Sequence, residues 1–179
     1  MTDMPKKERF QALVLAHLNS AFNLACWLTR SRQDAEDVVQ EACMRAFKYF
    51  DAFHGEDGRA WLLAIVRNTF YTWYCENRKR EDTMAFDEEC HSHEEANAAE
   101  RDDDPQALLM RKDNQRVLRQ AIDRLPLAYR EVIVLRELED LSYKEIAGIA
   151  DISIGTVMSR LGRGRQMLAD MLTSGSQEG

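Results

Sequence analysis

The chain has 179 residues, of which 45% are apolar and 31% are charged, a balance typical of one ordinary folded domain or two small ones. Only 8 glycines and 3 prolines are present, which excludes collagen-like and low-complexity chains and favours helix over turn-rich β-structure. No run approaches the ~18 consecutive apolar residues of a membrane-spanning helix, so no membrane insertion is expected. The 4 cysteines are spread without close pairing, which argues against a disulfide framework and indicates a reducing cytoplasm.

The net charge of −7 is unevenly distributed along the chain. Residues 81–107 carry 11 acidic side chains and 1 basic one, whereas 1–80 and 108–179 are close to neutral. Mutual repulsion and scarce apolar side chains predict that 82–107 is an extended, flexible linker. The overall acidity does not exclude nucleic acid as a partner, because basic side chains can still cluster locally.

Three helices are predicted before the linker, because apolar residues recur there at helical spacing. They cover 8–28, 34–50 and about 59–80, and the glycine-containing segment 51–58 forms a loop. The second helix has the clearest apolar stripe, which comprises Ala35, Val38, Val39, Ala42, Cys43, Ala46, Phe47 and Phe50. In the third helix the core side is expected to hold Leu62, Ile65, Val66, Thr69 and the rings of Trp61 and Trp73.

Two further helices are predicted after the linker, at about 105–125 and 127–138, with Pro126 between them. The tail at 174–179 is small and polar and is expected to be disordered. Together with the short helices that follow 138, the pattern predicts an all-α chain in which two small helical domains are joined by the acidic linker.

A helix-turn-helix is predicted near the C-terminus. Ser142 followed by Glu145 is a capping box that opens a short helix, residues 150–152 supply a turn, and Ser153 can cap a last helix to about residue 172. This layout inserts its second helix into the major groove of DNA, although an ordinary helical hairpin with a solvated basic side would show the same spacing. We call the outward side of that helix the groove face, whose DNA-binding candidates are Ser153, Thr156, Met158, Ser159, Arg160, Arg163 and Arg165, with Gln166 beside them.

Two other surfaces carry residues suited to binding. The side of helix 59–80 opposite its core stripe combines cations, aromatic rings and a short amide, which suits single-stranded DNA. This single-strand face comprises Arg67, Asn68, Tyr71, Thr72 and Arg78. The outer side of helix 34–50 presents an acidic stripe that either docks on a basic helical partner or is simply solvated. This docking stripe comprises Asp34, Asp37, Gln40, Glu41 and Met44.

Several motifs jointly resemble bacterial sigma-70 family factors. Residues 34–41 (DAEDVVQE) followed by 59–68 (RAWLLAIVRN) resemble region two of that family. Residues 125–135, 141–147 and 155–161 resemble region four, in the same order. No other sigma region fits between the two sets, so the chain resembles the two-domain extracytoplasmic-function (ECF) group.

The resemblance implies a domain organisation and a set of partners. Residues 1–81 would form region two and 108–173 region four. The partners would be core RNA polymerase, through its beta-prime coiled coil and beta flap, promoter DNA and an anti-sigma factor. Family members catalyse nothing themselves and need no cofactor or metal. In the family the connection between the regions threads toward the active-site cleft and RNA exit path, where acidic side chains could mimic nucleic acid.

The resemblance also assigns roles to individual positions. Asp37, Gln40 and Glu41 stand where the family docks on the beta-prime coiled coil. A flipped base of the −10 non-template strand would be held by the loop with Phe53, His54 and Gly55. Neighbouring −10 bases would be read by Asn68 and Thr72.

The −35 duplex would be read by Ser159 and Arg163. Two positions depart from the family pattern. Met158 replaces a basic residue that many members carry, which removes a base or phosphate contact. The loop between Phe53 and Trp61 is about one residue shorter than in some relatives, which alters the pocket for the flipped base.

Two other functions remain open from the residues alone. One is a stand-alone helix-turn-helix repressor or activator, which would bind duplex DNA without polymerase. The other is a metal- or redox-sensing protein built around Cys90, His91 and His93, whose ligand types suit zinc or copper. That cluster lacks the second paired ligand set of a zinc finger.

Overall fold

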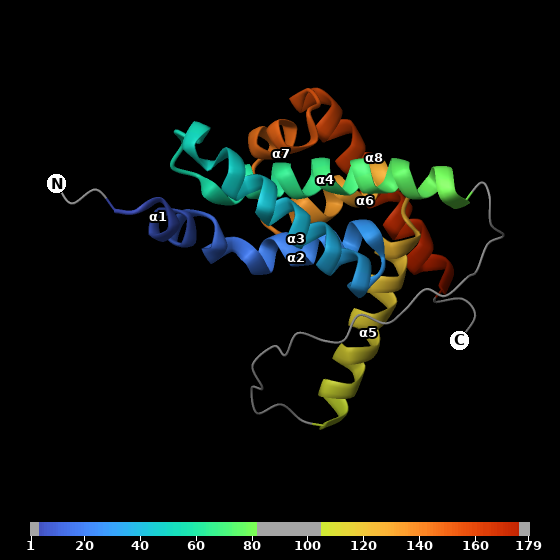
Figure 1. Ribbon diagram of the computed structural model, residues 1–179. Helices are drawn as coiled ribbons and strands as arrows, with labels where there is room; N and C mark the ends of the chain where they lie inside the picture. Colours follow the sequence, from blue (N-terminus) through green and yellow to red (C-terminus); the bar gives the residue numbers. More distant parts are fainter. Residues whose placement is uncertain (1–3, 82–104, 176–179) are drawn as a thin grey trace.

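The computed structural model describes residues 4–81 and 105–175, and its regular structure there is entirely helical, which confirms the predicted all-α class (Figure 1). We call 4–81 the N-terminal lobe and 105–175 the C-terminal lobe. The N-terminal lobe contains α1 (Lys6–Leu13), η1 (Leu15–His17), α2 (Leu18–Thr29), α3 (Arg32–Tyr49), η2 (Phe50–Ala52) and α4 (Gly58–Glu81). The C-terminal lobe contains α5 (Pro105–Arg124), α6 (Leu127–Ile133), η3 (Val134–Leu138), α7 (Tyr143–Ala150) and α8 (Ile154–Gly175).

The prediction of one continuous helix over 8–28 is wrong, because the chain leaves α-helical geometry at η1. The break accompanies a tight backbone contact between the end of α1 and the start of α4. A Cβ atom placed on the buried Gly58 would lie only 1.8 Å from the carbonyl oxygen of Leu13. Glycine is therefore required at Gly58, and this contact fixes the start of α4 against the first helix.

Helix α3 packs against α2 and α4, and its predicted apolar stripe largely forms the core of the N-terminal lobe. The helix begins where the Ser31 hydroxyl accepts a hydrogen bond from the backbone N–H of Asp34. The expectation that Phe47 is a core residue is wrong, since 43% of its surface is exposed. Its ring meets the edge of the Phe10 ring at the margin of the lobe, with centroids 5.1 Å apart.

The helix predicted over 127–138 is present, but its second half is wider than an α-helix. Residues Leu127–Ile133 are α-helical, and Val134–Leu138 continue as the π-helical segment η3. The chain then turns through Asp140, which has a positive φ of 52°, before the next helix begins. Glu139 lies between η3 and this turn, and its side chain pairs with Arg59 of α4 on the N-terminal lobe.

The predicted caps of the helix-turn-helix are confirmed. The Glu145 N–H donates to the Ser142 hydroxyl at 3.2 Å, and the Ser142 N–H donates to the Glu145 carboxylate at 2.7 Å. At the second helix, the Thr156 N–H donates to the Ser153 hydroxyl at 3.1 Å. These bonds satisfy backbone donors that a helix start leaves open, so the sequence sets where both helices begin.

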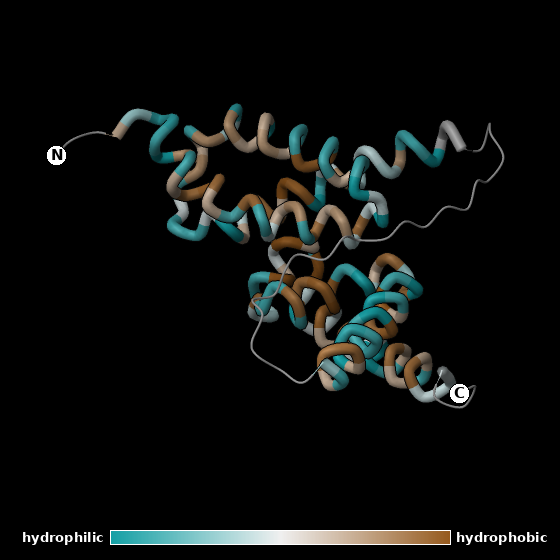
Figure 2. Tube along the Cα trace, turned by 90° about the horizontal axis from the view of Figure 1, so that it is seen from below, coloured by the Kyte–Doolittle hydropathy of each residue, from teal (hydrophilic) through white to brown (hydrophobic). Residues whose placement is uncertain are grey.

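The two lobes pack directly against each other, a contact that the predicted flexible linker does not imply. Helix α4 contacts α7, α2 contacts α6, and buried apolar residues of both lobes form one continuous cluster. Figure 2 shows hydrophobic segments gathered where the lobes meet. Most of the predicted linker, residues 82–104, lies outside the described residues. Its last residues belong to α5, whose first turns project from the rest of the C-terminal lobe (Figure 1).

The stretch Lys6–Thr29 is long and apolar enough to cross a membrane by length and composition alone. In the structure this stretch is divided by η1, and α2 buries Leu24, Ala25 and Leu28 against the rest of the lobe. Core helices of soluble proteins meet the same criterion. Packing within the lobe therefore accounts for the apolar character of this segment.

Candidate nucleic-acid interface

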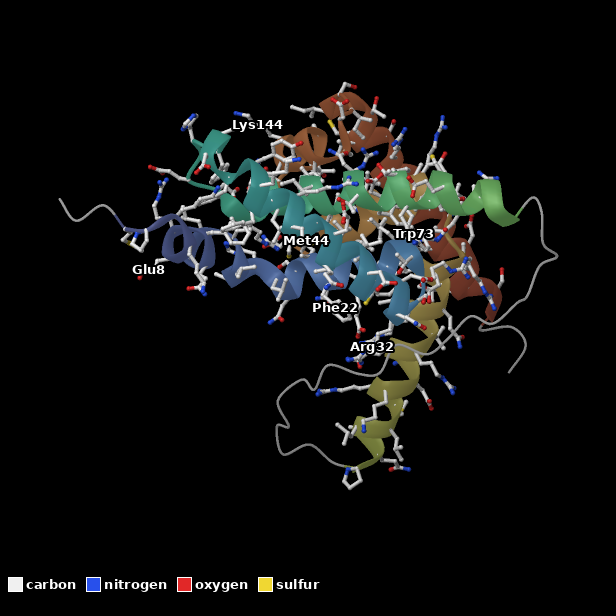
Figure 3. All side chains as sticks on the ribbon, viewed as in Figure 1. Glu8, Phe22, Arg32, Met44, Trp73 and Lys144 are labelled. Atoms are coloured by element: carbon white, nitrogen blue, oxygen red, sulfur yellow. The ribbon has the colours of Figure 1, made fainter. Side chains whose placement is uncertain are left out.

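The docking stripe lies on the outer side of α3, away from the core (Figure 3). Asp37, Gln40 and Met44 are exposed, and Met44 has 59% of its surface accessible. Glu41 is half-buried and pairs with Arg45, whose Nε lies 2.8 Å from its carboxylate. The stripe therefore presents acidic groups followed by one exposed apolar side chain at its C-terminal end, a composition that suits a basic helical partner.

The loop before α4 is held by an aromatic stack. The Phe53 ring stacks on Trp61 with centroids 4.6 Å apart, so Phe53 is half-buried. His54 and Gly55 are exposed, and Gly55 lies against the Phe53 ring, where a Cβ would come within 2.9 Å of it. The Asp57 carboxylate accepts a hydrogen bond from the backbone N–H of residue 60, which caps α4 directly after the loop.

Part of the single-strand face is open to solvent. Asn68 and Thr72 are exposed one turn apart on α4, and the Thr72 hydroxyl donates to the Asn68 carbonyl oxygen at 3.1 Å. The amide of Asn68 keeps a donor and an acceptor for an incoming base. Arg78 is also exposed, with its guanidinium 5.5 Å from the centre of the Tyr74 ring.

Two members of the single-strand face, Arg67 and Tyr71, contact the C-terminal lobe. Arg67 donates through Nε to the carboxylate of Glu131 on α6, and the Tyr71 hydroxyl donates to the same carboxylate at 3.3 Å. The Glu131 side chain is completely buried, and only 16% of the Arg67 side chain is exposed. Burial, reinforced by the negative charge of Glu131, raises the pKa of Tyr71. Their role in DNA binding remains a prediction.

A second ion pair joins the lobes near the start of α4. The Arg59 guanidinium lies 2.9 Å from the Glu139 carboxylate and also donates to the Glu139 backbone carbonyl. The Glu139 side chain is 5% exposed and that of Arg59 is 29% exposed. Sequence reasoning missed Glu131 and Glu139, because neither stands in a pattern that separates it from ordinary surface acids.

Arg130, beside Glu131 on α6, is a third link between the lobes. Its guanidinium donates to the backbone carbonyl of Leu28 on α2 at 3.4 Å and to that of Leu125 at 3.0 Å. Burial lowers the pKa of this arginine. The lobe contact thus contains several polar groups that are hydrogen-bonded to one another and to backbone, although Nε of Arg130 is buried without a hydrogen-bond partner.

The groove face of α8 is accessible in the observed arrangement of lobes. Met158 has 56% of its surface exposed, Ser159 and Arg163 are exposed, and Arg160 is half-buried. Arg165 is exposed but paired, since its guanidinium donates to Glu137 at 2.9 and 2.6 Å, which raises its pKa. On the inner side of the motif lie the buried residues Ile146, Ile149, Val157, Leu161 and Gly164.

No cluster suited to a metal is found in the described residues, 4–81 and 105–175, where no group of three or more His, Cys, Asp or Glu side chains could hold an ion. The hypothetical metal ligands Cys90, His91 and His93 lie outside the described residues. Burial raises the pKa of the Cys26 thiol to about 11, so at neutral pH it is protonated and unreactive.

Comparisons with known proteins agree with the two-lobe arrangement. The family model "Sigma-70 region 2" matches residues 13–80, and "Sigma-70, region 4" matches residues 115–168. The ECF RNA polymerase sigma-E factor of Haemophilus influenzae is 34% identical over 172 residues, which covers 93% of this chain and 88% of that protein. The sigma-E factor of Escherichia coli K12 is 32% identical over 164 residues, covering 90% and 85%.

Solved structures of sigma factors share the fold. The sigma factor RpoE of Bartonella quintana, crystallised with the anti-sigma factor NepR, has a TM-score of 0.75 and 29% identity, covering 93% of this chain and 98% of that one. The structure of CnrH in complex with the cytosolic domain of CnrY has a TM-score of 0.64 and 24% identity, and the match covers 94% of this chain and 90% of CnrH. At this identity the similarity supports the fold and nothing more. With both sigma regions matched and relatives aligned over most of their length, the chain belongs to the ECF group of the bacterial sigma-70 family and directs promoter-specific initiation of transcription.

Proposed function

We propose that this sigma factor binds core RNA polymerase through the docking stripe on α3. The stripe is acidic and largely exposed, and Met44 adds an apolar contact at its C-terminal end. A basic coiled coil, such as the beta-prime element that the family uses, has the complementary charge and shape. This surface lies on the outer side of α3, so it is accessible without any rearrangement of the two lobes.

Promoter DNA is bound at two separate surfaces. The single-strand face of α4, together with the loop at 53–55, binds the melted −10 strand, with Asn68 offering its amide to a base edge. The groove face of α8 enters the −35 major groove, with Arg163 reading a base and the helix start near phosphate. The observation that carries the proposal is that exposed Asn68 and exposed Arg163 lie at the two surfaces that the sequence motifs single out.

The factor acts in the cytoplasm by positioning polymerase and DNA, with no chemical step of its own. Regulation by an anti-sigma factor is part of the proposal. It is supported by the RpoE structure, in which a chain of the same fold and 29% identity is bound to an anti-sigma factor. The beta flap of polymerase is the proposed second contact, on the C-terminal lobe.

Reconstituted transcription tests the proposal directly. Purified factor is combined with core RNA polymerase on a library of genomic promoter fragments, and transcript starts are sequenced. We expect a set of starts that share −35 and −10 sequences and that are absent with core enzyme alone. Specific footprints on duplex DNA without polymerase, combined with no transcription, would instead favour a stand-alone helix-turn-helix regulator.

A further inference from the structure

The first helix of the chain contacts both ends of the loop at 53–57, whose first residues are proposed to bind the flipped −10 base. We call residues 53–57 the −10 loop. Residues 6–12 of α1 precede the segment that the region 2 model matches, which begins at residue 13. Figure 1 shows α1 at the end of the N-terminal lobe where the chain passes from α3 into α4. A helix outside the matched segment therefore borders the loop.

Three side chains of α1 contact the segment η2, through which the chain enters the −10 loop. Phe10 is only 5% exposed, and its ring lies edge-on to the Phe50 ring with centroids 5.3 Å apart. The Arg9 guanidinium lies 5.6 Å from the centre of the Phe50 ring. The Lys6 ammonium lies 2.7 Å from the Asp51 carboxylate. The position of η2 therefore depends on the position of α1.

Phe50 connects α1 to the −10 loop itself. The rings of Phe50 and Phe53 lie nearly parallel, with centroids 6.1 Å apart and 25° between their planes. The Phe53 backbone N–H also donates to the Phe50 carbonyl oxygen at 3.0 Å. Phe53 in turn stacks on Trp61 of α4. A shift of Phe10 or Phe50 must therefore move Phe53, because close-packed rings cannot be displaced independently.

The other end of the −10 loop is held by the backbone of α1. At Gly58 the Leu13 carbonyl oxygen occupies the place of a side chain, only 1.8 Å from an ideal Cβ. Gly58 is buried, whereas His54 and Gly55 in the middle of the loop are exposed. A short loop with an exposed middle takes its shape mainly from the scaffold that holds its two ends. Both ends contact α1, so α1 determines where His54 and Gly55 lie.

We propose that α1 positions the −10 loop, and that Phe10, supported by Arg9 and Lys6, places the loop for a flipped base without itself touching DNA. This inference rests on the proposed assignment of the loop to the −10 strand. Flipping a base out of the stack costs free energy that its pocket must return, and a binding site works only when its groups are held within about 0.5 Å of the productive geometry. Base selection at one −10 position therefore depends on α1, whereas reading by the exposed Asn68 of α4 does not.

The test measures base discrimination separately at each −10 position. Holoenzyme is reconstituted from core polymerase and the full chain on one promoter recovered by the genomic-library transcription. The −10 element of this promoter is randomised, and each version carries a barcode in the transcribed region, so sequencing gives the ratio of best to worst base at every position. Phe10→Ala is compared with Leu24→Ala, which removes a completely buried side chain of α2 in the same lobe and controls for lost stability.

We expect Phe10→Ala to lower discrimination about tenfold at one −10 position, because a misplaced pocket loses its contacts to a single base, and to leave the other positions unchanged. Leu24→Ala is expected to match the wild type at every position, at a temperature at which circular dichroism shows both variants to be folded. Wild-type discrimination by Phe10→Ala would overturn the proposal. So would equal losses in both variants, which reflect stability alone, or a uniform loss at all positions, which would place α1 on the DNA backbone.

An exchange of charges keeps the proposal testable if Phe10→Ala does not fold. Lys6→Glu and Asp51→Lys each place two like charges opposite each other, and the double variant restores an ion pair at unchanged net charge. The side chains of Lys6 and Asp51 are 36% and 76% exposed, so these substitutions leave the core intact. We expect each single variant to lower discrimination about threefold at the same position, as for an exposed ion pair, and the double variant to recover it. Single variants that discriminate like the wild type, or a double variant as impaired as the single ones, would refute the role of α1.

His54→Ala separates this proposal from the proposed function. His54 is exposed in the middle of the −10 loop, so its replacement changes the loop without moving α1. If the loop binds the flipped base, His54→Ala lowers discrimination at one position in the same assay. Unchanged discrimination with His54→Ala would count against the assignment of the loop itself. A loss with His54→Ala and none with Phe10→Ala would refute only the positioning role of α1.

Discussion

Replacing Gly58 with alanine is expected to destabilise the fold, because the end of α1 occupies the place of a side chain at this position. A Cβ on Gly58 would lie 1.8 Å from the carbonyl oxygen of Leu13 and 2.7 Å from its carbonyl carbon. Real Cβ contacts are essentially never shorter than 3.0 Å, so the two backbones must separate by about 1 Å or more. The obstacle is backbone, and no rotamer change can relieve it.

The cost follows from this overlap. Overpacking a close contact costs about 1–3 kcal/mol. Alanine gains little in return at Gly58, since this residue begins α4 and the helix preference of about 1 kcal/mol applies to helix interiors. For a chain of this size each kcal/mol lowers the melting temperature by about 2–4 °C, so we expect a decrease of about 2–12 °C.

Gly148 provides the matched control. It lies within α7, and a Cβ there meets no atom within 4 Å, so Gly148→Ala should raise stability by about 0.5–1 kcal/mol. Both variants are compared by thermal and urea unfolding followed by circular dichroism. If Gly58→Ala were as stable as Gly148→Ala, the contact between α1 and α4 could not be as close as described. Because Gly58 directly follows the loop at 53–57, its replacement should also impair promoter melting while −35 binding persists.

Four further variants test the proposed surfaces. Asp37→Arg combined with Glu41→Arg should abolish co-purification with core polymerase at unchanged helical content, because both lie outside the core and reversed charge at a close contact costs several kcal/mol. Arg163→Ala should lose about 1–3 kcal/mol at one −35 base pair in binding to promoter variants, whereas a uniform loss would indicate a phosphate contact. Met158→Arg should tighten duplex binding and steepen its salt dependence, and no change in either would place Met158 away from DNA. Asn68→Ala should reduce permanganate reactivity of promoter thymines and weaken discrimination among −10 bases; full melting with wild-type discrimination would remove Asn68 from the site.

Local patterns predicted the helices and caps well. The stripe of α3 predicted a core helix because apolar residues recur at helical spacing from Ala35 to Phe50, over about four turns at 3.6 residues per turn, and its members Ala35, Ala42 and Ala46 are fully buried. The capping box at Ser142 and the N-cap at Ser153 depend on groups three residues apart, so these two serines indicated the helix starts directly. Structural features that depend on residues within one or two helical turns could therefore be predicted from the sequence.

Structural features that depend on contacts between distant segments of the chain could not be predicted from the sequence. The break at η1 accompanies the approach of Leu13 to Gly58, and neither residue carries a local signal of the other. Phe47 continues the apolar stripe of α3, yet it lies at the margin of the lobe beside Phe10 and remains partly exposed. Helical periodicity indicates which side of a helix is apolar, but it does not indicate how much of that side a neighbouring helix covers.

The polar side of α4 illustrates the same limit at the functional surface. Arg67, Asn68 and Tyr71 all lie opposite the core stripe, so periodicity treats them alike. The structure separates them, because Glu131 of the other lobe binds Arg67 and Tyr71 while Asn68 stays exposed. A side chain able to bind a phosphate can bind a carboxylate equally well, and a surface built for nucleic acid is therefore also suited to an acidic contact within its own chain.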